Sequence, residues 1–259
     1  MALSWQQDSR LLRTPIIDVP ITATNMTDVL SFIEENIDGI KGEYICVSNA
    51  HTTVMAHDDP EYYRVQTESL MSLPDGKPLS IVGRKNIPTM DRVTGPDLMR
   101  EIFKVSEGHG YRHFFYGNTS EGLSALVNEL EQDYPYLNVC GYEPSVFRPL
   151  SSEEELELVE RINLTNPDFV WVALGAPRQE IFCHKMRGRI NGLMIGVGGA
   201  FNILARITPE APVWMQNLSL EWLYRLIQEP KRLFKRYFVT NTKFLHYQFF
   251  RIKRKKESK

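Results

Sequence analysis

DFVWVALG (residues 168–175) is the stretch that decides the fold of this chain, and GLMIGVGG (residues 192–199) repeats its pattern. Both are almost uncharged apolar runs of strand length that end in glycine. An apolar run without polar alternation is typical of a strand that is buried on both faces. A helix is expected to start near Pro177, between the two runs. A strand–helix–strand unit of this length predicts two parallel strands.

The same alternation of strands and helices extends over most of the chain. Further strands are expected at 16–21, 44–48, 78–83, 112–117 and 137–143, and further helices at 25–39, 50–59, 95–108, 120–134 and 151–165. Thr24-Asn25 offers a cap for the first of these helices, and a Ser-x-x-Glu capping box starts the last. This order of elements predicts an α/β fold with a mostly parallel sheet and helices on both faces.

Composition places the chain among ordinary globular proteins. Its 259 residues are 42% hydrophobic and 24% charged, enough for one large domain or two small ones. The longest nearly uncharged apolar stretch, 192–205, is too short and glycine-rich to span a bilayer, and residues 1–10 lack the pattern of a secretory signal. Three widely spaced cysteines, Cys46, Cys140 and Cys183, favour a reducing cytoplasm over disulfides or structural zinc.

The last 35 residues, 225–259, have a different character from the rest. They contain twelve Lys or Arg residues against two acids, Glu229 and Glu257, so they carry about +10, whereas the whole chain carries −2. Aromatic residues from Tyr237 to Phe250 interleave with these charges. Cations attract anionic lipid headgroups and aromatic rings enter the headgroup boundary, so the segment indicates docking on a membrane face. A solvated C-terminal helix and a nucleic-acid-binding patch are the alternatives.

Four turns follow expected strands, at the carboxyl ends where such sheets bind ligands. They span 48–51, 117–119, 175–180 and 196–199. Glycines in such turns let backbone N–H groups approach a phosphate, and helix N-termini favour anions. The candidate substrate-binding residues in these turns are Ser48, Asn49, His51, Gly117, Asn118, Gly175, Arg178, Gly198 and Gly199.

Neither a cofactor nor a metal is expected. In GVGGAF (196–201), Phe201 occupies the place of the last glycine of a dinucleotide fingerprint, and a P-loop motif is absent. The six histidines are scattered, and no His/Asp/Glu cluster or DxD motif has metal-ligand spacing. His57-Asp58-Asp59 comes nearest and reads as a solvated helix end. A nucleotide-sugar enzyme of this sequence would therefore offset the charge of a leaving diphosphate with side chains and helix dipoles.

Asp75, Arg92 and Gln179 are the candidate catalytic residues. Asp75 lies in SLPDGKPLS, where it is either part of a simple Asp-Gly turn or a carboxylate that accepts a proton from a hydroxyl group. Arg92 could hold a phosphate, or form a surface ion pair with Asp91 or Asp97. Gln179 starts an expected helix, where its amide suits a diphosphate or a sugar; alternatively, it only completes the first helical turn.

The order of several motifs resembles one family of enzymes. The motifs are SNAHTTVMA (48–56), LPDGKPL (73–79), DRVTGPDLM (91–99), FFYGN (114–118), ALGAPRQE (173–180), GVGGAFNILA (196–205) and APVWMQNLSLEWLYRLIQEPKRLFKRY (211–237). Together they are similar to the WecG/TagA/CpsF glycosyltransferase family over roughly residues 15–240. No single motif is specific, but their combination is.

The resemblance implies a Rossmann-like domain over 1–220 and a C-terminal basic amphipathic helical appendage over 221–259. It implies an inverting, metal-independent transfer of a sugar, often N-acetylmannosamine, from a UDP-sugar to an undecaprenyl-diphosphate-linked sugar at the inner membrane face. By position, Asp75 resembles the proposed general base of the family, and Arg92 and Gln179 match positions tied to activity. The residues that resemble the lipid-diphosphate and membrane contacts are Arg225, Arg232, Lys235 and Arg236.

Two positions depart from the family pattern. Val47 replaces a common threonine near the second strand, where Ser48 could supply the hydroxyl, and Glu210 replaces a basic residue common before APxW. The departure at Glu210 leaves the donor sugar open, with glucose or another hexose as the alternative to N-acetylmannosamine, and the departure at Val47 leaves the role of Ser48 open. A membrane-docked nucleotide-sugar-binding protein without turnover is the competing function. The sequence implies no nucleic-acid partner, leaves room for a homo-oligomer, and favours a cytoplasmic protein bound peripherally to the plasma membrane.

Overall fold

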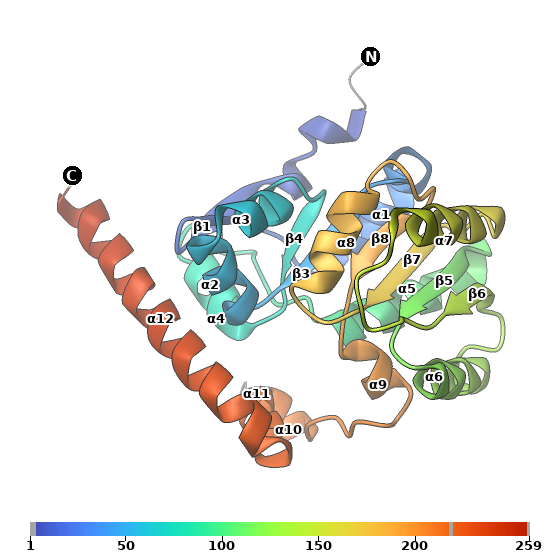
Figure 1. The fold of residues 1–259 in the computed structure, drawn as a ribbon. Helices are drawn as coiled ribbons and strands as arrows, with labels where there is room; N and C mark the ends of the chain where they lie inside the picture. The colour runs from blue at the N-terminus through green and yellow to red at the C-terminus, as the bar shows by residue number, and fades with distance from the viewer. Residues whose placement is uncertain (1–3, 218–219, 258–259) are drawn as a thin grey trace.

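Six parallel strands form the centre of the protein, and helices cover both faces of the sheet (Figure 1). The computed structural model describes residues 4–217 and 220–257. The strand order is β4-β3-β8-β7-β5-β6, and each neighbouring pair is parallel. The bounds are β3 Tyr44–Ser48, β4 Met71–Pro74, β5 Arg112–Gly117, β6 Asn138–Glu143, β7 Phe169–Ala173 and β8 Leu193–Gly196. The expected parallel α/β sheet is confirmed.

Alternate residues of each central strand point into two separate hydrophobic cores. Trp171 of β7 lies in the first core, which packs against α1 (Met26–Ile40), α5 (Gly95–His109), α6 (Ser120–Asp133) and α9 (Ala200–Leu204). Val170 and Val172 of the same strand lie in the second core, against α3 (Pro60–Thr67), α7 (Ser152–Leu164) and α8 (Arg178–Met186). All three side chains are 0% exposed. A strand that packs on both faces explains the continuous apolar run in the sequence.

Helix termini follow the capping chemistry expected from the sequence. The Asn25 side chain accepts from the backbone N–H of Asp28 at the start of α1. Ser151 and Glu154 form the reciprocal capping box that begins α7. A side-chain acceptor at a helix start satisfies a backbone donor that has no partner within the helix, so these residues fix where each helix begins.

Two expected strands were wrong. The segment 78–83 forms a helix, α4 (Lys77–Gly83), and the strand lies earlier, at β4. Pro78 is at the start of α4, where its fixed φ suits the first helical turn and its missing N–H costs nothing. The segment 16–21 is a hairpin of β1 (Arg13–Ile16) and β2 (Val19–Thr22), because Ile17 and Asp18 take positive φ angles of 44° and 70° and reverse the chain.

Three helices end the chain outside the sheet: α10 (Val213–Asn217), α11 (Glu221–Gln228) and α12 (Pro230–Glu257). Pro230 begins α12 and separates it from α11, as expected for a residue that cannot donate within a helix. Figure 1 shows α12 as a long rod that runs past α2 (Ala50–Asp58). Leu233 and Phe244 of α12 are buried, at 1% and 5% exposed, so this helix packs on the main domain.

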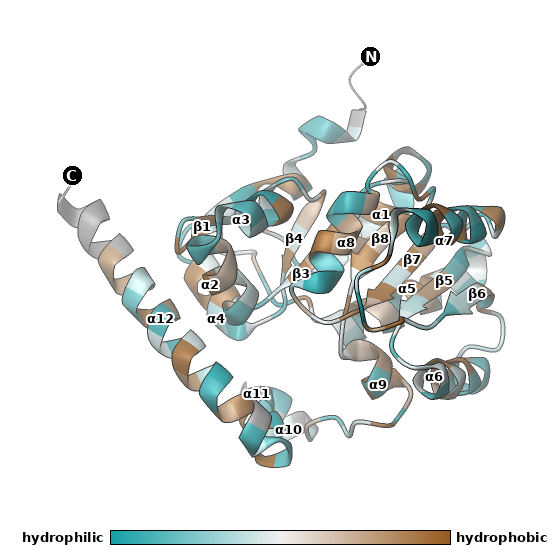
Figure 2. Cartoon of the chain, viewed as in Figure 1, coloured by the Kyte–Doolittle hydropathy of each residue, from teal (hydrophilic) through white to brown (hydrophobic). Residues whose placement is uncertain are grey.

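The outer side of α12 carries a second apolar stripe. Phe234, Phe238, Leu245 and Phe249 are 63%, 65%, 69% and 64% exposed, and they recur at helical spacing on one face. Figure 2 shows hydrophobic bands alternating with hydrophilic ones along this helix. No helix in the described part of the chain is both long and apolar enough to cross a bilayer. The division at residue 220 stays a prediction.

Candidate active site

Asp75 lies at the carboxyl end of β4, in the turn that leads to α4. Its backbone N–H donates to the carbonyl oxygen of Ser48 at 2.8 Å. The carbonyl of Pro74 accepts from the backbone N–H of Val93 at 2.9 Å. These two bonds fix the carboxylate between the ends of β3 and β4 and the loop that carries Arg92. The residue therefore stands at the edge of the sheet where ligands of parallel α/β proteins bind.

The surroundings of Asp75 make its carboxyl group a base that titrates near neutrality. The side chain keeps part of its surface open to solvent. Surrounding protein atoms nevertheless remove enough water that burial raises its pKa to about 6. Arg225 and Arg92 act against this rise, Glu221 adds to it, and a hydrogen bond with Asn49 lowers the pKa. A carboxylate of this pKa is ionised at pH 7 and can accept a proton from a hydroxyl group.

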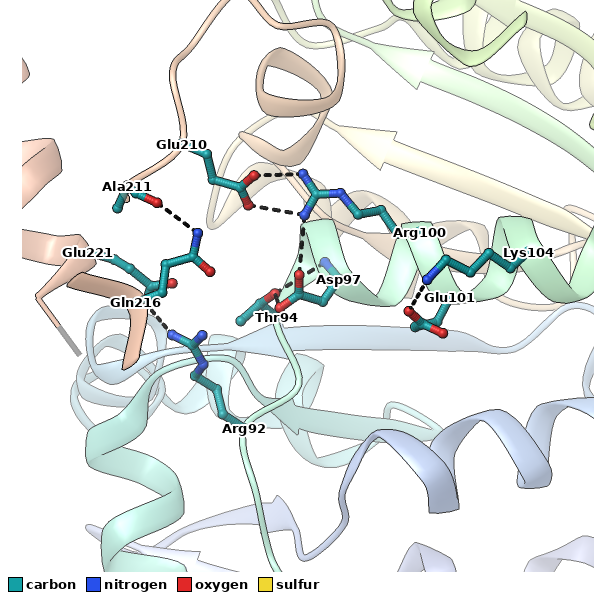
Figure 3. A network of polar contacts seen from close by, with 10 residues as sticks. All are labelled: Arg92, Thr94, Asp97, Arg100, Glu101, Lys104, Glu210, Ala211, Gln216 and Glu221. Atoms are coloured by element: carbon teal, nitrogen blue, oxygen red, sulfur yellow. Dashed lines mark hydrogen bonds and ion pairs between the residues drawn. The ribbon is translucent and has the colours of Figure 1, made fainter. Parts of the chain in front are cut away.

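Arg92 joins the main domain to the appendage. Its guanidinium is half-buried and forms an ion pair with Glu221, the first residue of α11 (Figure 3). The Asp91 carboxylate pairs with the guanidinium of Arg84 and accepts from the backbone N–H of Arg92, and Asp97 pairs with Arg100. The surface ion pair weighed from the sequence is therefore replaced by a contact with the appendage.

Arg100 holds the segment that leads into the appendage. Its guanidinium donates to both carboxylate oxygens of Glu210, at 3.1 and 2.8 Å (Figure 3). Two parallel bonds of this kind fix geometry as well as charge. Glu210 is the residue that departs from the family pattern, and the structure gives it a partner on α5 in place of a free charge.

Gln179 is buried at the start of α8 and fixes the turn before it. Its Oε1 accepts from the backbone N–H of Gly175 at 3.1 Å, and its Nε2 donates to Oε1 of Glu180 at 2.9 Å. A side chain at Gly198 would lie 3.0 Å from Gln179 Oε1, and Gly198 takes a positive φ of 54°. Gln179 therefore holds the turn after β7 against the turn after β8. Arg178 beside it is exposed.

The turn after β5 is built around Gly117 and Asn118. A Cβ at Gly117 would lie 2.4 Å from the carbonyl oxygen of Ala173, and its φ of 111° excludes most other residues. The Asn118 side chain donates to Oδ1 of Asn202 at 2.8 Å, and the backbone carbonyl of Asn118 accepts from the backbone N–H of Ser145 at 3.1 Å. These bonds bring two further segments, the loop after β6 and the start of α9, to the same edge of the sheet.

Asn202 and Phe147 were not found by sequence reasoning. Asn202 follows the glycines after β8, and Phe147 lies two residues beyond Ser145 in the loop after β6. Phe147 is 57% exposed and takes a φ of 54°. A large aromatic side chain exposed from such a backbone is a candidate contact for a flat ring. Asn202 lies within GVGGAFNILA (196–205), directly after the glycine-rich turn, and that position could have marked it; Phe147 lies in none of the quoted motifs.

Asn49 and His51 connect the site to α2 and α12. The Asn49 side chain caps α2 by accepting from the backbone N–H groups of His51 and Thr52, at 3.0 and 3.2 Å. Nδ1 of His51 lies 3.2 Å from the Thr240 hydroxyl of α12. Burial and the nearby Arg236 lower the pKa of His51, so it is neutral at pH 7. His51 thus contacts the appendage in this structure.

Ser48 points beneath the site. Its side chain is 1% exposed, and its hydroxyl contacts Gln66 at 2.6 Å and Ser72 at 2.8 Å. Neighbouring Val47, the other departure from the family pattern, is buried in the first core. A direct substrate contact by Ser48 stays a prediction, as does a contact by Gly199.

The appendage brings basic residues to the same region. Arg225 lies on α11 and acts on the charge of Asp75. Lys235 and Arg236 are exposed on α12, and Arg236 stacks over the ring of Tyr237 at 5.5 Å. The side chain of Arg232 lies outside the described residues, although its backbone is part of α12. Within the described residues, 4–217 and 220–257, no group of three His, Cys, Asp or Glu side chains is placed to bind a metal ion.

Comparison with known proteins places this chain in a family. The family model described as Glycosyl transferase WecG/TagA/CpsF family matches residues 14–259. The chain belongs to the WecG/TagA/CpsF glycosyltransferase family. The family and enzyme class expected from the sequence are thereby confirmed.

Two curated relatives in this family carry the same name, N-acetylglucosaminyldiphosphoundecaprenol N-acetyl-beta-D-mannosaminyltransferase. The protein from Bacillus subtilis is 31% identical over 220 residues, which cover 84% of this chain and 84% of the relative. The protein from Bacillus spizizenii is 28% identical over 221 residues, with the same coverage of both chains.

Replacing Gln179 or Arg92 with Ala is expected to lower kcat/KM for the sugar donor by about 10- to 100-fold, the loss typical of a bond to a charged group. Gln179 holds two turns of the predicted donor pocket, and Arg92 supplies charge beside Asp75. Steady-state kinetics and thermal unfolding measure the two effects separately. Gln132→Ala and Arg148→Ala, at exposed positions, are the matched controls. Unfolding with normal kinetics in the folded fraction would show that both residues are only structural.

Proposed function

We propose that the protein transfers a sugar, N-acetylmannosamine in the first instance, from a UDP-sugar to an undecaprenyl-diphosphate-linked sugar, with inversion at the anomeric carbon. The observation that carries the proposal is the position of Asp75. Its carboxylate stands at the edge of the sheet, has a pKa of about 6, and is flanked by Arg92 of the main domain and Arg225 of the appendage. A base beside two cations suits a hydroxyl group that attacks while a diphosphate leaves.

The donor fits the turns after β5, β7 and β8. The side chains of Gln179 and Asn118 hold these turns through hydrogen bonds to Gly175 and Asn202, and the N-terminus of α8 favours the diphosphate. The exposed ring of Phe147 supports a contact with the base, and Asn202 supports one with the ribose. These turns lie at the same edge of the sheet as Asp75, in the strand order β4-β3-β8-β7-β5, so a donor that extends from them toward β4 would bring its sugar to the base.

The acceptor fits the side that the appendage covers. Asp75 takes the proton of the acceptor hydroxyl, whose oxygen forms a bond to the anomeric carbon as the bond to UDP breaks. Attack from the face opposite UDP inverts the configuration. Holding both substrates in line contributes much of the rate. Arg225, Arg232, Lys235 and Arg236 would neutralise the lipid diphosphate, which cannot leave the bilayer. The names of the two Bacillus relatives support this acceptor class.

A donor screen tests the proposal. UDP-N-acetylmannosamine, UDP-N-acetylglucosamine and UDP-glucose are each incubated with the full chain and a synthetic prenyl-diphosphate-linked N-acetylglucosamine. We expect transfer from the first donor and a product with inverted configuration, read by proton coupling constants. Transfer from UDP-glucose would keep the enzyme class and change the sugar. Donor binding without transfer from any of them would favour the alternative of a binding protein without turnover.

Transfer is expected to proceed without a divalent metal ion. The sequence has no DxD motif, and Arg92 and the N-terminus of α8 offer positive charge to the leaving diphosphate. The rate is measured in EDTA and then with Mg²⁺ or Mn²⁺ added back. We expect rates within about twofold of one another, because Arg92 and the helix N-terminus perform the electrostatic stabilisation. A rate that collapses in EDTA and returns with metal would contradict this expectation.

A further inference from the structure

A chain of buried polar side chains runs beneath the candidate active site. It consists of Ser48, Ser72, Gln66, Tyr62, Glu180 and Gln179, each 5% exposed or less. It begins at the ends of β3 and β4, directly below Asp75, and finishes at the first turn of α8. Buried polar groups cost stability unless they are paired, so a connected set of this size calls for a role.

The first half of this buried polar chain has a defined direction. Oε1 of Gln66 accepts from the hydroxyls of Ser48 and Ser72, at 2.6 and 2.9 Å. Its Nε2 donates to the hydroxyl oxygen of Tyr62 at 3.0 Å. Since the Tyr62 oxygen accepts here, its own proton is available to another acceptor. The acidic side chain that acts on Tyr62 is Glu180.

At Glu180, near the end of this buried polar chain, one carboxylate oxygen accepts a hydrogen bond and the other does not. Its Oε1 accepts from Gln179 at 2.9 Å, whereas Oε2 makes no hydrogen bond of normal geometry with any described residue. Tyr62 still interacts with the carboxyl group and lowers its pKa, but burial dominates and raises the pKa to about 7. The thiols of Cys46 on β3 and Cys183 on α8 also face this carboxyl group. A neutral carboxyl is thus accessible near pH 7.

We propose that Glu180 is a positioning residue for sugar-donor binding. An amide can be turned over with its oxygen and nitrogen exchanged, and both orientations have nearly the same shape. Glu180 accepts from Nε2 of Gln179 while the backbone N–H of Gly175 donates to Oε1, so the two partners fix a single orientation. That orientation sets the turn before α8, where the diphosphate is expected.

The same arrangement links the two halves of the site. Gln66 is hydrogen-bonded to both Tyr62 and Ser48, and Tyr62 interacts with Glu180. The backbone carbonyl of Ser48 in turn accepts from the backbone N–H of Asp75. The same buried polar side chains therefore hold both the turn before α8, where the donor is expected, and the backbone of the catalytic base. This inference rests on the proposed function, because it assumes that the turn at Gly175 holds the donor.

Four variants of the full chain test the inference. Glu180→Gln keeps the shape and the Oε1 acceptor, Glu180→Leu removes the acceptor, and Tyr62→Phe removes a single hydroxyl group. Glu160→Gln, an exposed glutamate on α7, is the matched control. UDP binding is measured by calorimetry, donor KM and kcat by transfer assay, and stability by thermal unfolding.

We expect Glu180→Leu to raise the Kd for UDP and the donor KM by about 10- to 100-fold, since displacement of a positioned group by about 1 Å has effects of this size. Glu180→Gln should stay within about threefold of the original protein, as should the control. Tyr62→Phe should raise the donor KM by a few-fold with a smaller change in kcat. Tyr62→Phe keeps the buried aromatic ring, so its donor KM still tests the inference if Glu180→Leu does not fold.

Two results would overturn the inference. One is a lower unfolding temperature for Glu180→Leu or Tyr62→Phe with unchanged donor KM, which is the signature of a purely structural chain. The other is a Glu180→Gln variant as impaired as Glu180→Leu, because the shape-matched acceptor would then not restore binding. If the unaltered protein binds neither UDP nor a UDP-sugar, the proposed function itself fails, and the two failures are thereby distinguished.

Discussion

Asp75→Asn is expected to lower sugar transfer by about 10²- to 10⁴-fold, the usual contribution of a general base. The amide keeps the size of the carboxylate and can still hydrogen-bond Asn49, but it cannot accept the proton of the acceptor hydroxyl. UDP binding should persist, because the donor turns lie after other strands. Transfer from UDP-N-acetylmannosamine is compared with UDP affinity for the same preparation. Near-normal turnover of this variant would remove Asp75 from the mechanism.

The pH dependence of transfer provides a second test of Asp75. Burial raises its pKa to about 6, and the base acts only when it is ionised. Acceptor kcat/KM should therefore rise as the pH increases through about 6 and level off above 7. The rise should be missing in Asp75→Asn. Asp38→Asn is the matched control, since Asp38 is 92% exposed at the surface of α1. It should reproduce both the rate and the pH profile of the unaltered protein.

Local chemistry in the sequence was sufficient for most of the fold. The apolar run of β7 and the caps at Asn25 and Ser151 act through neighbouring residues, so their meaning can be read without the rest of the chain. The break at Pro230 is local in the same sense. The carboxyl ends of parallel strands then meet at one edge, and this rule brought the turns at Ser48, Gly117 and Gly175 together.

Short segments were ambiguous for a physical reason. The run PLSIVG at 78–83 is apolar and brief, and in such a run periodicity cannot separate a strand from a helix. The turn at Ile17 and Asp18 uses positive φ angles without glycine or asparagine, so its usual sequence signal is absent. In both places long-range packing decides the backbone. Asp75 was expected just before a strand at 78–83, and it lies instead just after a strand, β4. The error therefore left Asp75 at the end of a strand.

The polar contacts of the site were beyond prediction because their partners are far apart in sequence. Arg92 meets Glu221, Arg100 meets Glu210, and Gln66 meets Ser48 only through the fold. Glu180 was not among the candidate site residues, and its burial became evident only with the strands and helices in place. A sequence shows which residues can make such bonds, but their pairing depends on the tertiary structure.

Ending the chain at Leu220 is expected to abolish membrane binding and to lower transfer to a lipid-linked acceptor strongly. The truncation removes Arg225 from Asp75 and Glu221 from Arg92, so transfer should fall by about 10²-fold or more, the loss typical of missing transition-state charge stabilisation. It also removes the exposed stripe of Phe234, Phe238, Leu245 and Phe249. Thermal unfolding checks that the main domain still folds without α11 and α12.

Two substitution sets separate membrane docking from folding, because each leaves the buried contacts of Leu233 and Phe244 in place. Phe234→Ser with Phe238→Ser removes apolar insertion, and Lys235→Gln with Arg236→Gln removes attraction to anionic lipid. Lys104→Gln with Lys185→Gln, on α5 and α8, is the control with the same change in net charge. Co-sedimentation with vesicles, with and without phosphatidylglycerol, measures binding.

Both sets should lower vesicle binding severalfold, and the control should not. Binding of the unaltered chain should weaken as salt rises, since exposed charges are screened within about 8 Å at physiological ionic strength. The donor KM should stay unchanged in both sets, because the stripe lies on the outer side of α12, away from the turns that hold the donor. Equal sedimentation of the full and truncated chains, or no dependence on anionic lipid, would exclude the appendage as the docking element. Preferential binding of RNA over vesicles at physiological salt would assign its basic residues to nucleic acid instead.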